Sequence, residues 1–357
     1  MARAGAVYSG IHQTIKGGSN MKRQVLCVLT AAMLTVAMSL TGCGSGTQSE
    51  GTDAGQSGEA AASAGTGEQD REIKTPREPG NEEETMTSDQ KTKDSAILVV
   101  SFGTSYNDSR DITIGAVEKA VAEAYPQYEV RRAFTAQTII DILKKREGLE
   151  IDNMTQALDR AAADGIKKLI VQPTHLMDGF EYHDMVTELE EYSDLFDQIA
   201  VGKPLLSDEE DFKAVVRAIT DGAGSSDQED TAMVFMGHGT EAESNRVYKK
   251  LQNTLAEEGF DNYFIGTVEA EPDLDDVAAA LREKGVYKKV VLRPLMLVAG
   301  DHANNDMAGD EEDSWKTVLG AEGYEVECVL QGLGELKSIQ DLYVDHVQAA
   351  IESLEQP

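Results

Sequence analysis

The sequence predicts an α/β fold of two similar domains, each a parallel sheet flanked by helices, with a site in the cleft between them. Continuous apolar runs at residues 96–100 and 233–236 are typical of strands buried in a parallel sheet. Such runs alternate with stretches of helical periodicity, which indicates βαβ units. Segments of the first half also recur in the second half, which indicates a duplication.

The duplication covers strand and turn segments at matching positions. The first apolar run ends in SFGT at residues 101–104, and the second ends in GHGT at residues 237–240. Further along, KKLIVQP at residues 167–173 matches KKVVLRP at residues 288–294 with an offset of 121 residues. A chance likeness of two strand–turn segments explains these shared residues less well, so each half is expected to build the same sheet.

The remaining elements follow from periodicity. Apolar runs at residues 263–268 and 324–330 predict two further strands. Helices are expected at residues 137–145, 154–163, 244–258, 274–284 and 339–354, the last of which closes the fold. Ligands of open parallel sheets bind beyond the carboxyl ends of the strands, and two similar domains place such a site in the cleft between them.

Charge and cysteine content exclude some classes of function. The formal net charge of −32 argues against sequence-independent nucleic-acid binding, which needs a positive surface. Only three cysteines are present, Cys27, Cys43 and Cys328, and the first two belong to an apolar N-terminal segment. The folded body therefore holds no disulfide and no CxxC pair, so a metal site in it has to use histidine and carboxylate ligands.

The N-terminal part predicts export. Residues 21–43 combine a basic start, an apolar run too short to span a membrane and a small-residue end, as in a signal peptide. The last four residues, LTGC, resemble a lipobox, which implies acylation of Cys43 and a lipid anchor on the outer side of the cell membrane, or a periplasmic location. An ordinary cleaved signal with a chance cysteine is the alternative.

The predicted organisation has four parts. Residues 1–43 form an upstream extension and a lipoprotein signal peptide, and residues 44–94 form a disordered acidic tether because they carry almost no large apolar side chains. Residues 95–225 form an N-terminal α/β domain. Residues 226–357 form a C-terminal α/β domain that holds the candidate metal ligands and the closing helix.

Three strand ends of the second half carry metal-ligand chemistry. His238 and Glu269 follow two strands, and His302 lies beyond a third. Two neutral imidazoles and one carboxylate suit a borderline divalent metal, and three protein ligands leave positions open for exchange. The alternatives are a structural histidine in a tight glycine turn and a Glu269 that caps the following helix.

The first half lacks both imidazoles at the matching positions. Phe102 corresponds to His238, and Glu181 corresponds to His302. We therefore expect the first half to present a surface for something flat or apolar. The candidate substrate-binding residues are Ser101, Phe102, Gly103 and His175. His175 with His183 as a second metal pair stays open as the less favoured interpretation.

Four motifs together resemble the anaerobic sirohydrochlorin cobalt chelatases, an ATP-independent class II family of tetrapyrrole chelatases. They are SFGTS (101–105), MGHGT (236–240), VEAEPDLD (268–275) and PLMLVAGDHANNDMAGDEEDSW (294–315). The resemblance implies two similar α/β domains around a tetrapyrrole cleft, with His238, Glu269 and His302 as metal ligands and His238 and Glu269 as catalytic residues.

The function that the resemblance implies is insertion of Co²⁺ into sirohydrochlorin, a step of cobalamin biosynthesis that releases two pyrrole protons. The implied partners are a tetrapyrrole, a divalent metal ion and, through the anchor, a membrane. No nucleotide or organic cofactor is implied, in keeping with the lack of a Walker A loop. Two alternatives remain: a surface-tethered metal- or haem-binding lipoprotein without turnover, and a chelatase that uses iron. The oligomeric state stays open.

Overall fold

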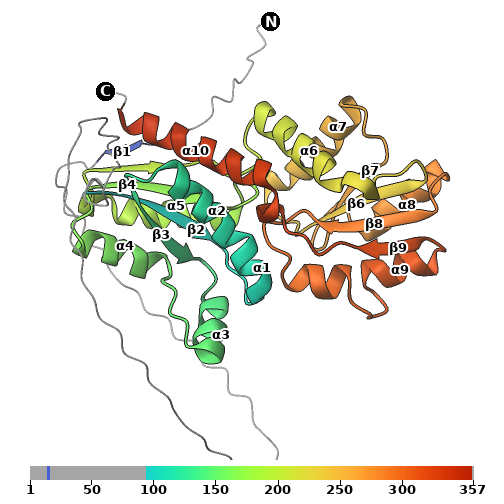
Figure 1. The fold of residues 1–357 in the computed structure, drawn as a ribbon, viewed down its shortest axis with the longest axis horizontal. Coiled ribbons are helices and arrows are strands. Elements are labelled where there is room, and N and C mark those ends of the chain that lie inside the picture. The colour runs from blue at the N-terminus through green and yellow to red at the C-terminus, as the bar shows by residue number, and fades with distance from the viewer. Residues whose placement is uncertain (1–13, 17–93, 356–357) are drawn as a thin grey trace, which may run out of the picture. The chain divides into compact units, whose positions relative to one another are not determined.

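The computed structural model describes residues 14–16 and 94–355 (Figure 1). The predicted signal peptide, Cys43 and the predicted tether lie outside the described residues. A short strand, β1 (Thr14–Lys16), pairs antiparallel with β5 (Gln198–Val201) of the main body. In the described part of the chain, no helix has the length and apolar character that crossing a bilayer requires.

Two parallel sheets form the core of the body, one in each half. The first has the order β1-β5-β4-β2-β3 and the second has the order β7-β6-β8-β9. The predicted strands are present as β2 (Ser95–Ser101), β4 (Lys168–Pro173), β6 (Thr231–Gly237), β7 (Tyr263–Thr267), β8 (Lys289–Pro294) and β9 (Glu325–Cys328). The first sheet also contains β3 (Glu129–Phe134) and β5 (Gln198–Val201), which were not predicted from the sequence. When β2 is matched with β6, and β4 with β8, the four parallel strands of each half have the same order. The predicted fold class and the duplication are confirmed.

Ten α-helices connect and flank these strands in the described chain. The predicted helices at residues 154–163 and 274–284 have the expected ends, because capping boxes at Asn153 and Asp273 start them. The helices are α1 (Asn107–Ile112), α2 (Ile114–Ala124), α3 (Gln137–Glu147), α4 (Met154–Ala163), α5 (Phe180–Glu191), α6 (Glu209–Ala223), α7 (Arg246–Glu257), α8 (Leu274–Lys284), α9 (Trp315–Ala321) and α10 (Lys337–Glu355).

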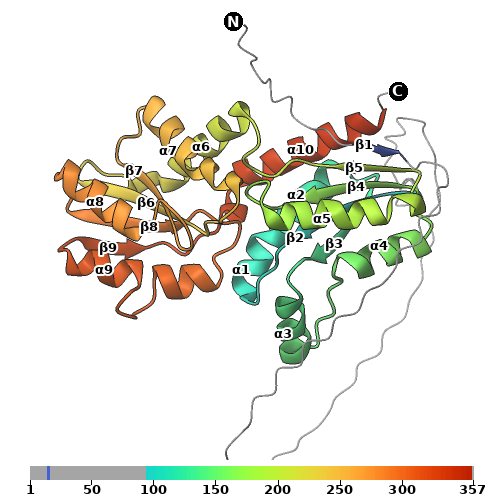
Figure 2. The ribbon, with the colours of Figure 1, turned by 180° about the vertical axis from the view of Figure 1, so that it is seen from behind.

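The continuous apolar run of β2 has a direct packing reason. Ala96, Leu98 and Val100 face a cluster formed with α4 and α5, whereas Ile97 and Val99 face a second cluster formed with α2 and α10. Figure 2 shows α4 and α5 on one side of this sheet, and Figure 1 shows α2 and α10 on the other. A strand covered on both faces needs apolar side chains at every position.

Two helices tie the halves together. α6 ends just before the predicted domain boundary at residue 225, and its Phe212 and Val216 pack in the same cluster as Phe235 of β6. The terminal helix α10 packs at its start in this cluster and at its end on the first sheet. Buried His346 of α10 contacts Asp211 of α6, with 3.0 Å between Nε2 and Oδ1.

Candidate metal centre

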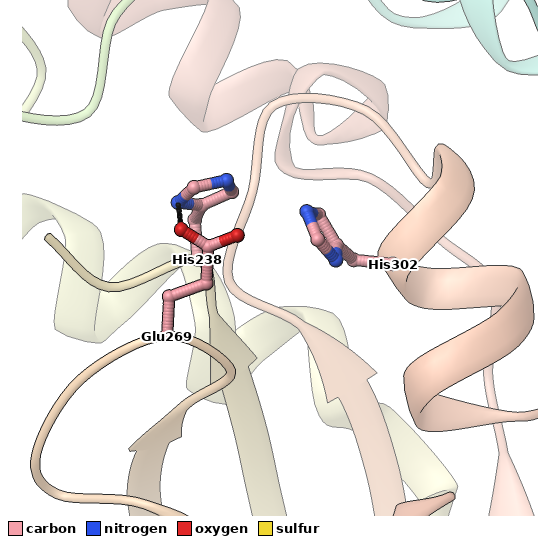
Figure 3. A group of neighbouring side chains, drawn as sticks. All are labelled: His238, Glu269 and His302. Atoms are coloured by element: carbon pink, nitrogen blue, oxygen red, sulfur yellow. Dashed lines mark ion pairs between the residues drawn. The ribbon is translucent and has the colours of Figure 1, made fainter. Parts of the chain in front are cut away.

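The three predicted ligands lie together at the carboxyl edge of the second sheet (Figure 3). β6 lies between β7 and β8, so the segments that follow these three strands leave the sheet side by side. One ligand atom from each of His238, Glu269 and His302 lies within 4.8 Å of the other two. The two imidazole rings meet edge to face, with their centroids 4.8 Å apart.

The turn after β6 orients His238. Its Nδ1 lies 2.8 Å from the carbonyl oxygen of Gly239. Since a carbonyl oxygen can only accept a hydrogen bond, Nδ1 carries the proton and Nε2 keeps its lone pair for a metal ion.

Glycine at position 239 is required by this turn. Gly239 has a φ of +87°, and a Cβ there would lie 2.8 Å from both the Ala270 nitrogen and Thr267 Oγ1. The Gly239 amide also donates to the hydroxyl of Tyr248, whose pKa burial raises to about 12. The glycine thus lets the backbone turn tightly enough to place His238 beyond the strand.

A second carboxylate orients His302. Nδ1 of His302 lies 2.8 Å from Oδ2 of Asp306, four residues along a π-helical turn over Ala303–Met307. The carboxylate accepts from Nδ1, which leaves the lone pair of Nε2 free for a metal ion. Asp306 was not among the residues predicted for the site, although its spacing of four residues from His302 is the sequence signal for such a partner.

The carboxylate of Glu269 is available as a ligand. The backbone amide of Glu269 donates to the carbonyl oxygen of His238 at 2.9 Å, which joins the two segments that carry these candidate ligands. Asp273 provides the cap of α8, since its side chain accepts from the Asp276 amide. The alternative of Glu269 as the helix cap is therefore wrong. Oε2 of Glu269 lies 3.8 Å from Nδ1 of His238.

The donor set suits capture and release of a divalent ion. The side chains of His238, Glu269 and His302 are 49%, 55% and 31% exposed, so an ion reaches them without opening the core. Two donors bound to one ion at about 2.1 Å lie at most about 4.2 Å apart. Small side-chain rotations therefore bring these three onto a common ion, and further coordination positions stay open for another ligand.

The predicted substrate-binding residues after β2 have different surroundings. Phe102 is 48% exposed, whereas Ser101 is buried and its hydroxyl accepts a hydrogen bond from Thr174. Gly103 has a φ of +102°, and a Cβ there would lie 2.6 Å from the ring of Phe134. Ser101 and Gly103 thus shape the turn, and Phe102 is the side chain that this turn presents to solvent.

His175 lies just beyond β4 and is nearly inaccessible. Burial lowers its pKa to about 4, so its imidazole is neutral at pH 7. Its Nε2 lies 3.9 Å from Oε2 of Glu181, the counterpart of His302 in the first half. Burial raises the pKa of Glu181, and the nearby His238 opposes that shift, which places Glu181 near the metal centre. His183 is exposed on α5.

A histidine–glutamate–histidine set at the strand ends of a duplicated α/β fold defines a metal-binding protein of the chelatase type. Residues 95–352 match the family described as cobalt chelatase (CbiK). The sirohydrochlorin cobaltochelatase of Salmonella typhimurium is 40% identical over 256 residues, which cover 72% of this chain and 96% of that protein. Sirohydrochlorin cobaltochelatase CbiKC of Nitratidesulfovibrio vulgaris is 33% identical over 264 residues, which cover 72% of this chain and 91% of that protein.

The chain belongs to the cobalt chelatase (CbiK) family, which confirms the predicted resemblance. Among solved structures, SirB from Bacillus subtilis with Fe³⁺ has a similar fold, with a TM-score of 0.51 and 18% identity over 73% of this chain and 98% of that one. At this identity the likeness concerns the fold alone. The predicted lipoprotein form concerns residues beyond those that the structure describes.

Proposed function

We propose that this protein inserts Co²⁺ into sirohydrochlorin without a nucleotide, in an exported and lipid-anchored form. The cluster of His238, Glu269 and His302 is the observation that carries the proposal, because it offers a divalent ion an open set of three ligands. The names of the two relatives, both sirohydrochlorin cobaltochelatases, support the choice of metal and tetrapyrrole.

The residues of the site divide the work as follows. Nε2 of His238 and Nε2 of His302 bind the ion, and the carboxylate of Glu269 offsets part of its charge. Insertion replaces two pyrrole N–H bonds by bonds to the metal, so two protons have to leave the macrocycle. Once His238 has handed over the ion, its neutral imidazole is free to accept one of them, and water at the exposed site takes the other.

The first half supplies the opposing apolar contact. Phe102 is exposed and follows β2 just as His238 follows β6. A flat macrocycle between the halves would place one face on this ring and direct its nitrogens toward the metal ligands. His175 and Glu181 are polar groups of the same half, and the charge of His238 acts on the pKa of Glu181.

Export is supported by residues 21–43, with their basic start, short apolar run and terminal Cys43. In this proposal the thiol of Cys43 carries the lipid, and residues 44–94 connect the anchor to the body. Membrane fractionation of cells that express the wild type and Cys43→Ala tests it. Wild-type protein in the membrane fraction and released variant protein support the anchor, whereas equal release of both refutes it.

The test of the chelatase function is an anaerobic absorbance assay. Sirohydrochlorin and Co²⁺ are mixed with a catalytic amount of residues 44–357, with His238→Ala as the matched variant. Turnover above the uncatalysed rate that His238→Ala abolishes supports the proposal. A spectral shift that saturates at one ligand per protein, without turnover, would instead identify a tetrapyrrole-binding lipoprotein. A parallel series with Fe²⁺ shows whether iron is the better substrate.

A further inference from the structure

The segment that leads from β8 to His302 packs against the first half. We call residues 295–302 the metal loop. Leu297 and Val298 of this loop are partly buried against an apolar cluster of the first half, formed by Ile114, Phe134, Ile140, Leu143 and Ile151. The loop therefore belongs to the second half by sequence but is packed in part by side chains of the first.

Two hydrogen bonds from the first half also hold the metal loop. The buried amide of Ala299 donates to the hydroxyl of Ser109 at 3.0 Å. The hydroxyl of Tyr106 donates to Oδ1 of Asp301 at 3.2 Å, and the Asn305 side chain donates to the same oxygen at 2.9 Å. Asp301 directly precedes His302, so these contacts reach to within one residue of a metal ligand.

The opposite side of the metal loop is also fixed. The amides of Leu333 and Gly334 donate to the carbonyl oxygens of Met296 and Leu297 at 2.9 and 3.0 Å. A Cβ on Gly332 would lie 2.5 Å from the carbonyl oxygen of Leu297, which shows how closely this segment approaches the loop. The start of the loop is therefore bound within the second half. Its end near His302 is held by Asn304 of the same half, whose side chain donates to the Ala299 and Gly300 carbonyl oxygens at 3.2 and 2.7 Å, and by Ser109 and Tyr106 of the first half.

We propose that Tyr106 and Ser109 are positioning residues for metal binding, which hold the metal loop so that His302 faces His238 and Glu269. Neither side chain is itself a candidate ligand. The inference rests on the proposed function in one respect, namely that these three residues bind the ion. It adds that the half of the protein without metal ligands sets the affinity of the site in the other half.

The first experiment measures the dissociation constant for Co²⁺ by anaerobic calorimetric titration of the full chain, without any tetrapyrrole. Tyr106→Phe removes the hydroxyl and leaves the ring, and we expect about 2- to 10-fold weaker binding. The matched control is Tyr287→Phe, since the Tyr287 hydroxyl donates to the Asp261 carbonyl at the same 3.2 Å. That control should bind Co²⁺ with wild-type affinity.

A double-mutant cycle tests whether Tyr106 acts through Asp301. Asp301→Ala changes affinity by itself, since it removes a charge next to His302. In that background Tyr106→Phe should have no further effect. Ser109→Ala should also weaken Co²⁺ binding and alter the visible absorption of bound Co²⁺, because the freed Ala299 amide lets the loop move.

The outcomes separate this inference from the proposed function. Wild-type affinity in Tyr106→Phe, alongside lost binding in His238→Ala, would overturn the inference and leave the metal site standing. Weakened Co²⁺ binding in Tyr106→Phe, in a protein that shows no chelatase turnover, would uphold the inference while the proposed reaction fails. Absence of Co²⁺ binding by the wild type would overturn both.

Discussion

The hydrogen bond between Asp306 and His302 makes a sharp prediction about metal affinity. Asp306→Ala removes the carboxylate that accepts from Nδ1 of His302 at 2.8 Å, while all three predicted ligands remain. Loss of such a partner frees the ring to rotate, allows the other tautomer and lowers the basicity of the metal-binding nitrogen.

The structure sets the size of the expected effect. Partners of metal-bound histidines contribute about 10- to 100-fold to metal affinity. The Asp306 side chain is 43% exposed, so water replaces part of the lost interaction, and we expect the lower end of that range. The dissociation constant for Co²⁺ should therefore rise about 10-fold, which corresponds to about 1.4 kcal/mol.

The assay is anaerobic titration with Co²⁺ in the absence of a tetrapyrrole, and Asp310→Ala is the charge-matched control. Asp310 carries the same charge four residues further on, but it pairs with Lys316 and is 95% exposed. Asp310→Ala should leave the affinity nearly unchanged. If both variants weaken Co²⁺ binding equally, general electrostatic attraction explains the effect, and the orienting role assigned to Asp306 is refuted.

Three further predictions concern stability and substrate binding. His175 stays neutral in the fold down to about pH 4, whereas the unfolded chain takes up the proton near pH 6.5. Proton uptake by the unfolded chain therefore does not affect the free energy of unfolding above pH 6.5 and lowers it as the pH falls from 6.5 toward 4. Urea unfolding at pH 7 and pH 4.5 should show a drop in unfolding free energy that is roughly 2 to 3 kcal/mol larger for the wild type than for His175→Gln, and equal drops would contradict this. His346→Ala removes the imidazole beside Oδ1 of Asp211, while Oδ2 keeps the amides of Ser207 and Asp208; the loss of this buried hydrogen bond should cost about 1 to 3 kcal/mol by the same method, and an unchanged free energy of unfolding would contradict it. Phe102→Ala should raise KM for the tetrapyrrole about 2- to 10-fold and leave Co²⁺ affinity unchanged, so an unaltered KM would remove Phe102 from the binding surface.

Local patterns were enough to predict most of the secondary structure. The apolar runs that became β2 and β6 are buried at every position, and the capping residues Asn153 and Asp273 start their helices where the periodicity begins. The three metal-ligand candidates could also be found, because each follows a strand and the carboxyl ends of parallel strands share one edge.

Other features of the site had no local signal. Tyr106 and Asp301 are 195 residues apart in the chain, and nothing near either one indicates their hydrogen bond. The exposure of Phe102 and the burial of Ser101 beside it depend on which neighbours pack over the turn. The terminal helix was expected to close the fold, but its packing on the first sheet and in the cluster that contains α6 and Phe235 follows from long-range contacts.

The sequence by itself determined the fold class, the duplication, the family and the three candidate ligands, because periodicity, turn residues and motif spacing act over short stretches of chain. Only the tertiary structure decided that Asp306 orients His302 and that the first half holds the metal loop of the second. The contacts to the metal loop form between segments that meet only after both sheets have packed, so their geometry depends on the whole body. The Asp306 contact is local, and it depends on the π-helical turn over Ala303–Met307 that brings the two side chains together.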